Sequence, residues 1–263
     1  PHWPVTPLAC PTLTPDIRRT TELENHHMTI AINEDHVALS STVADFLSRH
    51  GSLAAARALL DGAPDALPAF WSDLSELGWL GLHLPESVGG SGFGLEELVV
   101  VVEQTGRALM PEPFVPTVIA STALSIAGTE DQRSRLLPGM ANGSVTVAVA
   151  LDGEVTVSGA KATGAVRTAV GAGIADLLVV PAGDDMVIVT LRHSNGATDE
   201  AVGPLAAGAT VEVPLNLDPT RRSGRVTLDG AAAEIVPGGR QALLDAARLL
   251  FAAEAVGICR EST

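Results

Sequence analysis

Cysteine is scarce in this sequence of 263 residues: the two cysteines, Cys10 and Cys259, lie near opposite ends of the chain. Such an isolated pair makes neither a disulfide framework nor a metal-ligand cluster, so we expect a protein of the reducing cytoplasm. The histidines show no His-Glu-x-x-His motif and no other ligand spacing, and we expect no metal site. Apolar runs of the roughly 18–20 residues that a membrane span needs are also missing. The sequence therefore predicts a soluble protein.

Basic residues are scarce as well. There are 16 lysines and arginines against 31 aspartates and glutamates, which gives a formal net charge of −15. A surface of this sign repels a phosphate backbone, so we expect no nucleic-acid partner. A small anionic ligand remains compatible with it, because local arginines and backbone N–H groups can hold one. Apolar residues are plentiful, at 46% of the chain, and suffice for a sizeable core.

The first 27 residues differ from the rest of the chain. They are proline-rich, lack helical periodicity and contain no apolar segment of the kind found in secretory signals. Met28 begins a more ordinary sequence, "MTIAINEDH". We interpret residues 1–33 as a foreign or disordered segment with the native start at Met28, and a genuine disordered arm is the alternative.

Residues 34–143 carry apolar side chains at helical spacing. The first set falls at positions i, i+4, i+7 and i+8, and similar sets lie before and after a glycine-rich stretch. These sets are Leu39, Val43, Phe46 and Leu47; Phe70, Trp71, Leu74 and Leu77; and Leu95, Leu98, Val99 and Val102. Further along, Pro116 opens and Gly128 closes another helix, and Thr129 with Gln132 makes a capping box. We therefore predict an α-helical domain over 34–143.

The glycine-rich stretch, "HLPESVGGSGFGLEEL" at residues 83–98, raises the question of phosphate binding. No Lys-Ser or Lys-Thr follows the glycines, as a P-loop requires, and the dinucleotide fingerprint with its acidic residue about 20 positions later is not met. Ser91 is followed by Gly92-Phe93, which breaks the nucleophile-elbow pattern. We predict a structural turn here, and we interpret His83 as a core or surface residue rather than a catalyst.

The spacing changes at Gly143. Short β-branched runs follow, separated by Gly, Asp, Pro or Asn: "SVTVAVAL", "EVTVSG", "DLLVVPAG", "MVIVTLR", "TVEVPLNL" and "GRVTLDG". This pattern predicts an antiparallel β domain over 144–237, a sandwich or a small barrel. Helical spacing returns in the alanine- and leucine-rich segment 238–263. Because its apolar stripe needs a partner and little chain remains to provide one, we expect the first helix of a truncated helical domain.

Four charged residues are candidates for function. Glu254 lies within the apolar helix near the end of the chain, and Glu103 follows a run of valines. Each is either a functional buried carboxylate or, in the interpretation we favour, a helix residue paired with an arginine. Arg221 and Arg222, in "DPTRRSG", either hold an anionic ligand or form salt bridges with Asp218 or with a partner domain. For these two arginines the sequence does not decide between ligand binding and a salt bridge.

Five phrases occur in an order that resembles the acyl-CoA dehydrogenase family, particularly its actinobacterial branches. They are "FWSDLSELGWLGLHLPESVGGSGFGLEELVVVVEQTGRAL", "GTEDQRSRLLPGMANGS", "VSGAKATG" with "ADLLVVPA", "LDPTRRSGRVTLDGAAAEIV" and "AAEAVGICREST". The resemblance runs from about Glu34 to Thr263. It covers the N-terminal and middle domains of the family and only the start of the C-terminal domain.

The resemblance implies a fold, a reaction and a cofactor. In this family a helical N-terminal domain precedes a β domain and a C-terminal helical domain, and FAD binds between the last two. A glutamate takes the α-proton of an acyl-CoA while the flavin accepts the β-hydride. The resemblance further implies a cytoplasmic homo- or hetero-oligomer of fatty acid or sterol β-oxidation. Such a protein passes electrons to an electron-transfer flavoprotein or a similar acceptor.

The resemblance also assigns flavin contacts to two stretches, and both depart from the family. Leu151 and Asp152 fall on the first stretch, where Asp152 replaces a flavin-contacting threonine and a Pro-Gly-Ser-Asp section is missing. Thr168, Ala169 and Val170 fall on the second, where the family has an aromatic residue that stacks on the ring. We expect these five residues to contact the cofactor.

The catalytic residue is not identified by this comparison. Most members of the family carry their catalytic glutamate, and further FAD contacts, in the C-terminal domain, so we expect the base beyond Thr263. Glu254 falls in the region where a minority of members place their base, and it is a remote candidate.

Three hypotheses for function follow. The first is an FAD-dependent acyl-CoA dehydrogenase present as an incomplete chain, which we expect to be inactive as given. The alternative is a flavin-poor, non-catalytic partner subunit of a heteromeric acyl-CoA dehydrogenase, because both flavin stretches are degenerate. A stand-alone binding module without a redox role is the third.

Overall fold

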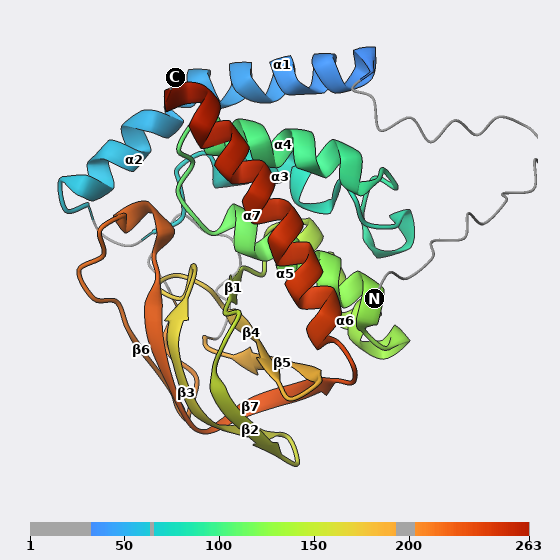
Figure 1. Cartoon of the computed structure of the whole chain (residues 1–263), viewed down its shortest axis with the longest axis vertical. Coiled ribbons are helices and arrows are strands. Elements are labelled where there is room, and N and C mark those ends of the chain that lie inside the picture. Colours follow the sequence, from blue (N-terminus) through green and yellow to red (C-terminus); the bar gives the residue numbers. More distant parts are fainter. Residues whose placement is uncertain (1–32, 64–65, 193–202, 263) are drawn as a thin grey trace, which may run out of the picture. The chain divides into compact units, whose positions relative to one another are not determined.

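The computed structural model describes residues 33–63, 66–192 and 203–262 (Figure 1), so the interpretation of the N-terminal segment lies outside the described residues. The helices are α1 (Glu34–Arg49), α2 (Ser52–Leu60), α3 (Trp71–Glu76), α4 (Leu95–Arg107), α5 (Phe114–Ala127), α6 (Glu130–Ala141) and α7 (Arg240–Ser262), with short 3-10 turns η1 (Trp79–Gly81), η2 (Glu86–Val88) and η3 (Pro219–Arg221). The strands are β1 (Val147–Val149), β2 (Glu154–Ser158), β3 (Lys161–Ala169), β4 (Leu177–Ala182), β5 (Asp185–Thr190), β6 (Ala209–Glu212) and β7 (Gly224–Val236). None of the described helices is long and apolar enough to cross a membrane.

Helices α1 and α6 begin where side chains satisfy their free N–H groups. Asn33 accepts a hydrogen bond of 2.8 Å from the His36 N–H at the start of α1. The predicted capping box of α6 is confirmed, because Thr129 Oγ1 accepts from the Gln132 N–H at 3.2 Å and Gln132 Oε1 accepts from the Thr129 N–H at 3.1 Å. The predicted helical character of 34–143 is thus confirmed, although the spacing did not indicate the alanine-rich α2.

The glycine-rich stretch is a tight turn between η2 and α4, as predicted. Its N–H groups donate to the preceding segment: Ser91 N to the Gly81 carbonyl at 3.0 Å, and Gly92 N to the Leu84 carbonyl at 2.9 Å. Glycine is required at position 90, because a Cβ there would lie 2.1 Å from the Leu84 carbonyl oxygen. These N–H groups are therefore used within the protein and do not form a phosphate cradle.

The strands form a mixed sheet in the order β1-β4-β5-β7-β3-β2, with β6 paired to β7. Among the described strands, five pairings are antiparallel as predicted, but β1 runs parallel to β4. The connection explains this, because after β1 the chain passes through the β2–β3 hairpin before it returns as β4 beside β1. In the described part of the chain β1 and β2, the two ends of this order, do not pair, so the predicted barrel closure is not found.

Two strands organise this sheet. β7 pairs with β3 and β6 through its first part and with β5 through residues 233–236. β3, which the sequence did not indicate, pairs with both β2 and β7. Its alanines and Gly164 have low β propensity, and a register shift between Val166 and Ala169 interrupts its alternation. A strand of this composition gives no clear period-two signal.

Two hydrophobic cores hold the helices and strands together. The larger one lies among the helices and reaches the sheet through Val147, Val149 and Val179. The smaller one lies on the other side of the same strands and contains Ala148 and Leu178. β1 and β4 are therefore buried on both faces, which explains why their sequences are nearly continuous apolar runs.

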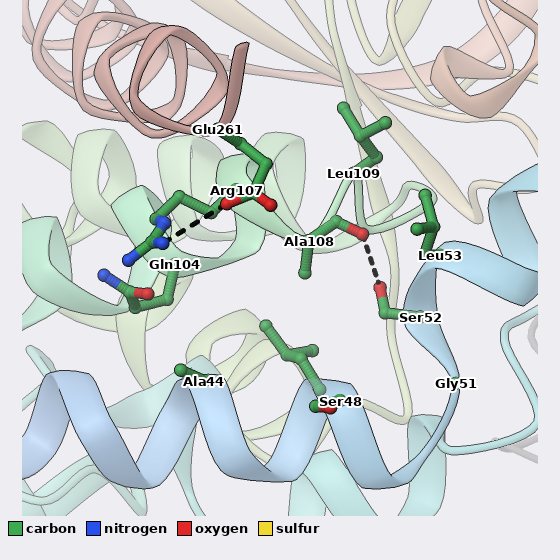
Figure 2. Close-up of a pocket in the computed structure, with 11 residues that line it drawn as sticks. Ala44, Ser48, Gly51, Ser52, Leu53, Gln104, Arg107, Ala108, Leu109 and Glu261 are labelled. Carbon is green, nitrogen blue, oxygen red and sulfur yellow. Dashed lines mark hydrogen bonds and ion pairs between the residues drawn. The ribbon is translucent and has the colours of Figure 1, made fainter. Parts of the chain in front are cut away.

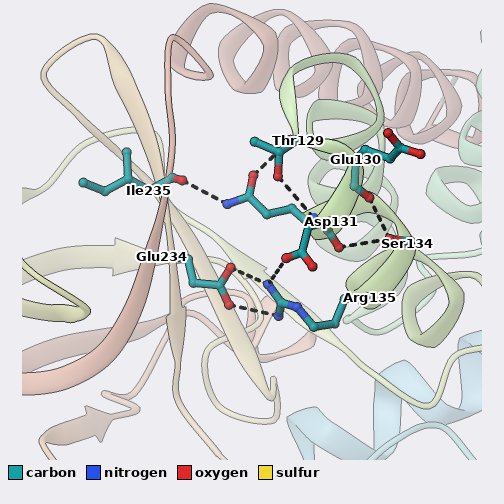
Figure 3. A network of polar contacts seen from close by, with 8 residues as sticks. Thr129, Glu130, Asp131, Ser134, Arg135, Glu234 and Ile235 are labelled. Atoms are coloured by element: carbon teal, nitrogen blue, oxygen red, sulfur yellow. Dashed lines mark hydrogen bonds and ion pairs between the residues drawn. The ribbon is translucent and has the colours of Figure 1, made fainter.

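A polar network joins α6 to β7 (Figure 3). The Gln132 side chain donates to the Ile235 carbonyl at 2.9 Å. Arg135 donates through both terminal nitrogens to the two oxygens of Glu234, at 3.0 and 2.7 Å. Because the two contacted residues follow each other on β7, the network fixes the position of α6 along that strand.

The last described helix, α7, returns to the helical part and packs against α4 and α5 (Figure 1). Two glycines allow the close approach: a Cβ on Gly257 would lie 1.9 Å from the Glu103 carbonyl oxygen, and one on Gly106 would lie 2.2 Å from the Glu254 carbonyl oxygen. The expectation that this helix finds no partner in the chain is therefore wrong, because the earlier helices cover its inner side. Its other side exposes two large apolar side chains, Leu249 and Val256.

Candidate functional site

A cavity of about 760 Å³, here called the β3 cavity, is lined by β3, by the connection from β1 to β2 and by α7. Four of the residues predicted to contact a cofactor line it: Leu151, Asp152, Thr168 and Val170. Ala169, the fifth, is fully buried in the smaller core instead. The other lining residues are Val149, Gly153, Glu154, Ala165, Arg167 and Phe251. Two separate stretches of the β part and one helix thus meet at one cavity.

Backbone pairing between Val149 and Val170 brings the two stretches together. The Val149 N–H donates to the Val170 carbonyl at 3.0 Å, and the Val170 N–H donates back at 2.8 Å. The residues that follow β1 therefore lie beside the end of β3, although they are far apart in the sequence. The register shift near the end of β3 lets two successive residues, Arg167 and Thr168, line the cavity together.

The turn that follows β3 is held by Arg192, which lies just after β5. Its guanidinium donates to the carbonyl oxygens of Ala172, Gly173 and Ala175 at distances from 3.0 to 3.3 Å. Burial lowers the pKa of Arg192, and the nearby carboxylate of Asp176 partly offsets that effect. Sequence reasoning missed Arg192, because nothing local marks an arginine whose partners lie 17 to 20 positions earlier.

Phe251 reaches the β3 cavity from α7, and it is the one aromatic side chain among the described lining residues. Sequence reasoning missed it, although it is the only aromatic residue in the sequence of α7. The cavity also carries two carboxylates, Asp152 and Glu154, and one guanidinium, Arg167. No group of three or more His, Cys, Asp or Glu in the described residues is placed to hold a metal ion. The lining suits an organic ligand with an apolar body and polar edges.

Comparisons with known proteins identify the family. Residues 33–144 match the family model "Acyl-CoA dehydrogenase, N-terminal domain". Acyl-CoA dehydrogenase IpdE2 of Mycobacterium tuberculosis is 29% identical over 85% of the chain and 60% of its own length, and IpdE2 of Mycolicibacterium smegmatis is 30% identical over 86% of the chain and 61% of its own length. The chain belongs to the acyl-CoA dehydrogenase family. It spans about three-fifths of the length of these curated relatives.

Solved structures of acyl-CoA dehydrogenases share the fold. The Tcur3481-Tcur3483 steroid ACAD has a TM-score of 0.74 at 26% identity, over 88% of this chain and 65% of that chain. The ChsE4-ChsE5 complex from Mycobacterium tuberculosis has a TM-score of 0.73 at 23% identity, over 89% of this chain and 66% of that chain. The fold of this chain, in which helices combine with a mixed, open sheet, is therefore an acyl-CoA dehydrogenase-like fold.

Glu254, the remote candidate for the base of an acyl-CoA dehydrogenase, is buried on α7 and does not line the β3 cavity. Its carboxylate accepts a hydrogen bond of 2.6 Å from Arg221 Nη1, and the same nitrogen donates to Glu112 at 3.1 Å. Arg221 also forms an ion pair with Asp218 at 3.4 Å. Glu254 thus makes the arginine pairing that the sequence favoured, and Arg221 holds carboxylates of the protein itself.

These contacts join the half-buried Arg221 to the buried Glu112 and Glu254 in a cluster, here called the Arg221 cluster. Burial, followed by the charge of Glu254, raises the pKa of Glu112 to about 8, although Arg221 opposes the shift. Burial likewise raises the pKa of Glu254 against the effect of Arg221. With a pKa of about 8, Glu112 is largely protonated at neutral pH, so most of its negative charge is absent from the cluster.

The other candidates, Arg222, Glu103 and His83, lie away from the β3 cavity. Arg222 is buried, and burial lowers its pKa. Glu103 forms the predicted ion pair with an arginine, Arg260. His83 is mostly buried beside α5, and burial lowers its pKa to about 4, so the ring is neutral. None of these side chains lines the β3 cavity.

A second cavity, of about 330 Å³, lies between α1, α2 and α4 (Figure 2). Gln104 and Arg107 line it from α4, and Arg107 donates to Glu261 at 3.2 Å. Ser52 lines it from α2 and donates to the Ala108 carbonyl at 3.2 Å. None of the residues predicted to contact a cofactor lines this cavity, so it is separate from the β3 cavity.

Proposed function

We propose that the protein is an FAD-dependent acyl-CoA dehydrogenase, which forms a Cα–Cβ double bond in an acyl-CoA thioester, and that the β3 cavity is part of its flavin site. One observation carries this proposal. Residues 151–152 and 168–170 are the two stretches to which the family resemblance assigns flavin contacts, and residues of both stretches line the same cavity.

The residues of the β3 cavity fit the flavin ring. The cavity of about 760 Å³ lies within the range of roughly 300–1,000 Å³ that ligand pockets occupy. Leu151 and Val170 offer aliphatic surface to an aromatic ring, and the Thr168 hydroxyl offers a hydrogen bond to its polar edge. Arg167 lies on the same wall, where it can attract an anionic group. When bound, FAD supplies the hydride-accepting chemistry that protein side chains lack.

The family resemblance places the catalytic base in the C-terminal domain, outside the residues that line the β3 cavity. A general base must come within hydrogen-bond reach of the proton that it removes. Glu254 does not line the β3 cavity, and its carboxylate accepts a hydrogen bond from Arg221, so Glu254 is not placed to remove this proton. We therefore propose that the base is a glutamate beyond Thr263.

The proposal keeps the domain division that the sequence predicts. Residues 34–143 form the helical N-terminal domain, residues 144–237 form the β middle domain, and residues 238–263 form the first helix of the C-terminal helical domain. The change from helices to strands after α6 and the return to a helix at α7 support these boundaries. The exposed Leu249 and Val256 on α7 offer a surface on which further helices can pack.

A second candidate function is a non-catalytic partner subunit of a heteromeric acyl-CoA dehydrogenase. Asp152 stands where the family has a flavin-contacting threonine, and residues 168–170 lack an aromatic side chain. The Tcur3481-Tcur3483 steroid ACAD, which this chain resembles, is named for two proteins. For either function we propose an acyl-CoA of fatty acid or sterol metabolism as the substrate, and an electron-transfer flavoprotein or a similar protein as the electron acceptor.

Titration of the purified protein with FAD, followed by fluorescence anisotropy, tests the proposed flavin site. We expect saturable binding that is weakened in Ala165→Trp, because the indole takes up part of the β3 cavity. Thr163→Trp is the matched control, since Thr163 is exposed on the same strand but does not line the cavity. Equal FAD binding by the two variants would contradict the site. Binding that requires an added partner chain would support the second candidate function.

A further inference from the structure

The aromatic side chain at the β3 cavity comes from a helix and not from the sheet. Aromatic residues are rare in this chain, which has five phenylalanines, three tryptophans and no tyrosine. Residues 168–170, where the family has a stacking aromatic, are Thr-Ala-Val. Phe251 on α7 lines the cavity together with Thr168 and Val170, so the cavity has an aromatic lining residue although residues 168–170 supply none.

The part of α7 that carries Phe251 is held by contacts on both sides of it. Leu250 is fully buried in the larger core. Glu254, about one turn further, accepts the hydrogen bond from Arg221. Gly257, in the next turn, lies against the Glu103 carbonyl oxygen. Because these contacts fix the helix, the backbone that carries Phe251 is positioned before any ligand binds.

We infer that Phe251 is the residue that packs against the flavin ring in this protein, and that it supplies from α7 the aromatic contact that the β part lacks. This inference rests on the proposed flavin site. A half-buried phenyl ring on an alanine- and leucine-rich helix offers the flavin a flat apolar surface, and aromatic pairs attract each other beyond their buried area. Loss of the ring is expected to weaken FAD binding about two- to tenfold.

A tryptophan at position 251 gives a direct test of contact. An indole that touches a flavin quenches its fluorescence, because the indole transfers an electron to the excited ring and then recovers it without net reaction. We expect the emission of bound FAD to fall severalfold in Phe251→Trp relative to the wild type. Val256→Trp is the matched control, because Val256 is exposed on the same helix and does not line the β3 cavity. We expect the control to leave the emission unchanged.

Phe251→Leu provides the second measurement, in case the larger tryptophan disturbs packing. We expect FAD binding about two- to tenfold weaker than in the wild type, while Val256→Leu binds FAD as the wild type does. Thermal unfolding checks that each variant is folded. If the wild type binds FAD and the two tryptophan variants emit alike, the inference about Phe251 is overturned and the flavin site stands. If the wild type binds no FAD, alone or with a partner chain, the proposed function itself fails and the inference fails with it.

Discussion

The Nη1 atom of Arg221 lies 2.6 Å from Oε1 of Glu254, and this contact ties η3, just before β7, to α7. The same nitrogen holds Glu112 from the segment between α4 and α5. Three parts of the chain that are distant in sequence therefore meet at one half-buried guanidinium. Because Phe251 lies three residues before Glu254, the cluster also positions the helix that borders the β3 cavity.

Arg221→Met leaves the carboxylate of Glu254 buried without a counter-charge and removes the hydrogen bond to Glu112. We expect the free energy of unfolding to fall by about 3–5 kcal/mol, the usual cost of removing one partner of a buried ion pair. Urea denaturation followed by circular dichroism measures this loss. The control is Arg248→Met, which removes an exposed arginine paired with Asp245 and is expected to cost less than about 1 kcal/mol. Equal losses in the two variants would contradict the role of the cluster.

The Arg221 cluster also makes stability depend on pH. The pKa of Glu112 is raised from 4.5 to about 8, so between these values the folded protein holds a proton that the unfolded chain has released. This contribution to stability is fully present below pH 4.5 and is lost as the pH rises through about 8. We expect the free energy of unfolding to decline more steeply over this range in the wild type than in Glu112→Gln. The midpoints of urea denaturation, measured for both proteins across this pH range, test the expectation. If the midpoints of the two proteins change with pH in parallel, the raised pKa of Glu112 is contradicted.

Local patterns predict the helices of this chain because their signals span only a few residues. The spacing of Leu39, Val43 and Phe46 indicates α1, and Thr129 with Gln132 marks the start of α6. The sequence does not predict β3, because this strand is stabilised by pairing with β2 and β7 and many of its own residues have low β propensity. The sequence also does not predict the parallel pairing of β1 with β4, because this pairing depends on where the β2–β3 hairpin lies.

The candidate site is predictable only where the family resemblance assigns cofactor contacts, although the residues in both assigned stretches depart from the family. Four expected cofactor contacts, Leu151, Asp152, Thr168 and Val170, line the β3 cavity. Phe251 and Arg192 have no such signal, because their positions depend on how α7 and the turn after β3 pack. Arg221 and Glu112 lie 109 positions apart, so the choice between a ligand-binding arginine and a buried ion pair required the structure.

Gly257 lies where α7 approaches α4 most closely. Alanine favours a free helix over glycine by about 1 kcal/mol, so helix propensity alone predicts that Gly257→Ala is stabilising. In the folded protein the new Cβ would lie 1.9 Å from the Glu103 carbonyl oxygen, a backbone atom, and α7 has to move. We expect the free energy of unfolding to fall by about 1–3 kcal/mol, measured by urea denaturation.

The control for this substitution is Ala255→Gly, at an exposed position of the same helix. It removes a methyl group without affecting the contact with α4, and we expect it to cost about 1 kcal/mol through helix propensity alone. A stabilised Gly257→Ala protein would show that the two helices are not in close contact in solution.

Arg192 holds the turn after β3 by donating to three carbonyl groups at once. Lysine keeps the positive charge but has a single ammonium group in place of the planar fork, so Arg192→Lys cannot satisfy all three carbonyls with the same geometry. We expect the free energy of unfolding to fall by about 1.5–3 kcal/mol, as for lost hydrogen bonds to a charged group.

The effect of Arg192→Lys should also be local to the β3 cavity. Val149 and Val170 pair just before the turn, so we expect their amide hydrogens to exchange faster in this variant, as measured by hydrogen–deuterium exchange. Arg225→Lys, at an exposed position of β7, is the control and is expected to change stability by less than about 0.5 kcal/mol. If the Val170 amide exchanges at the same rate in all three proteins, the turn keeps its shape without the guanidinium. In that case Arg192 contributes to the stability of the fold but not to the shape of the cavity.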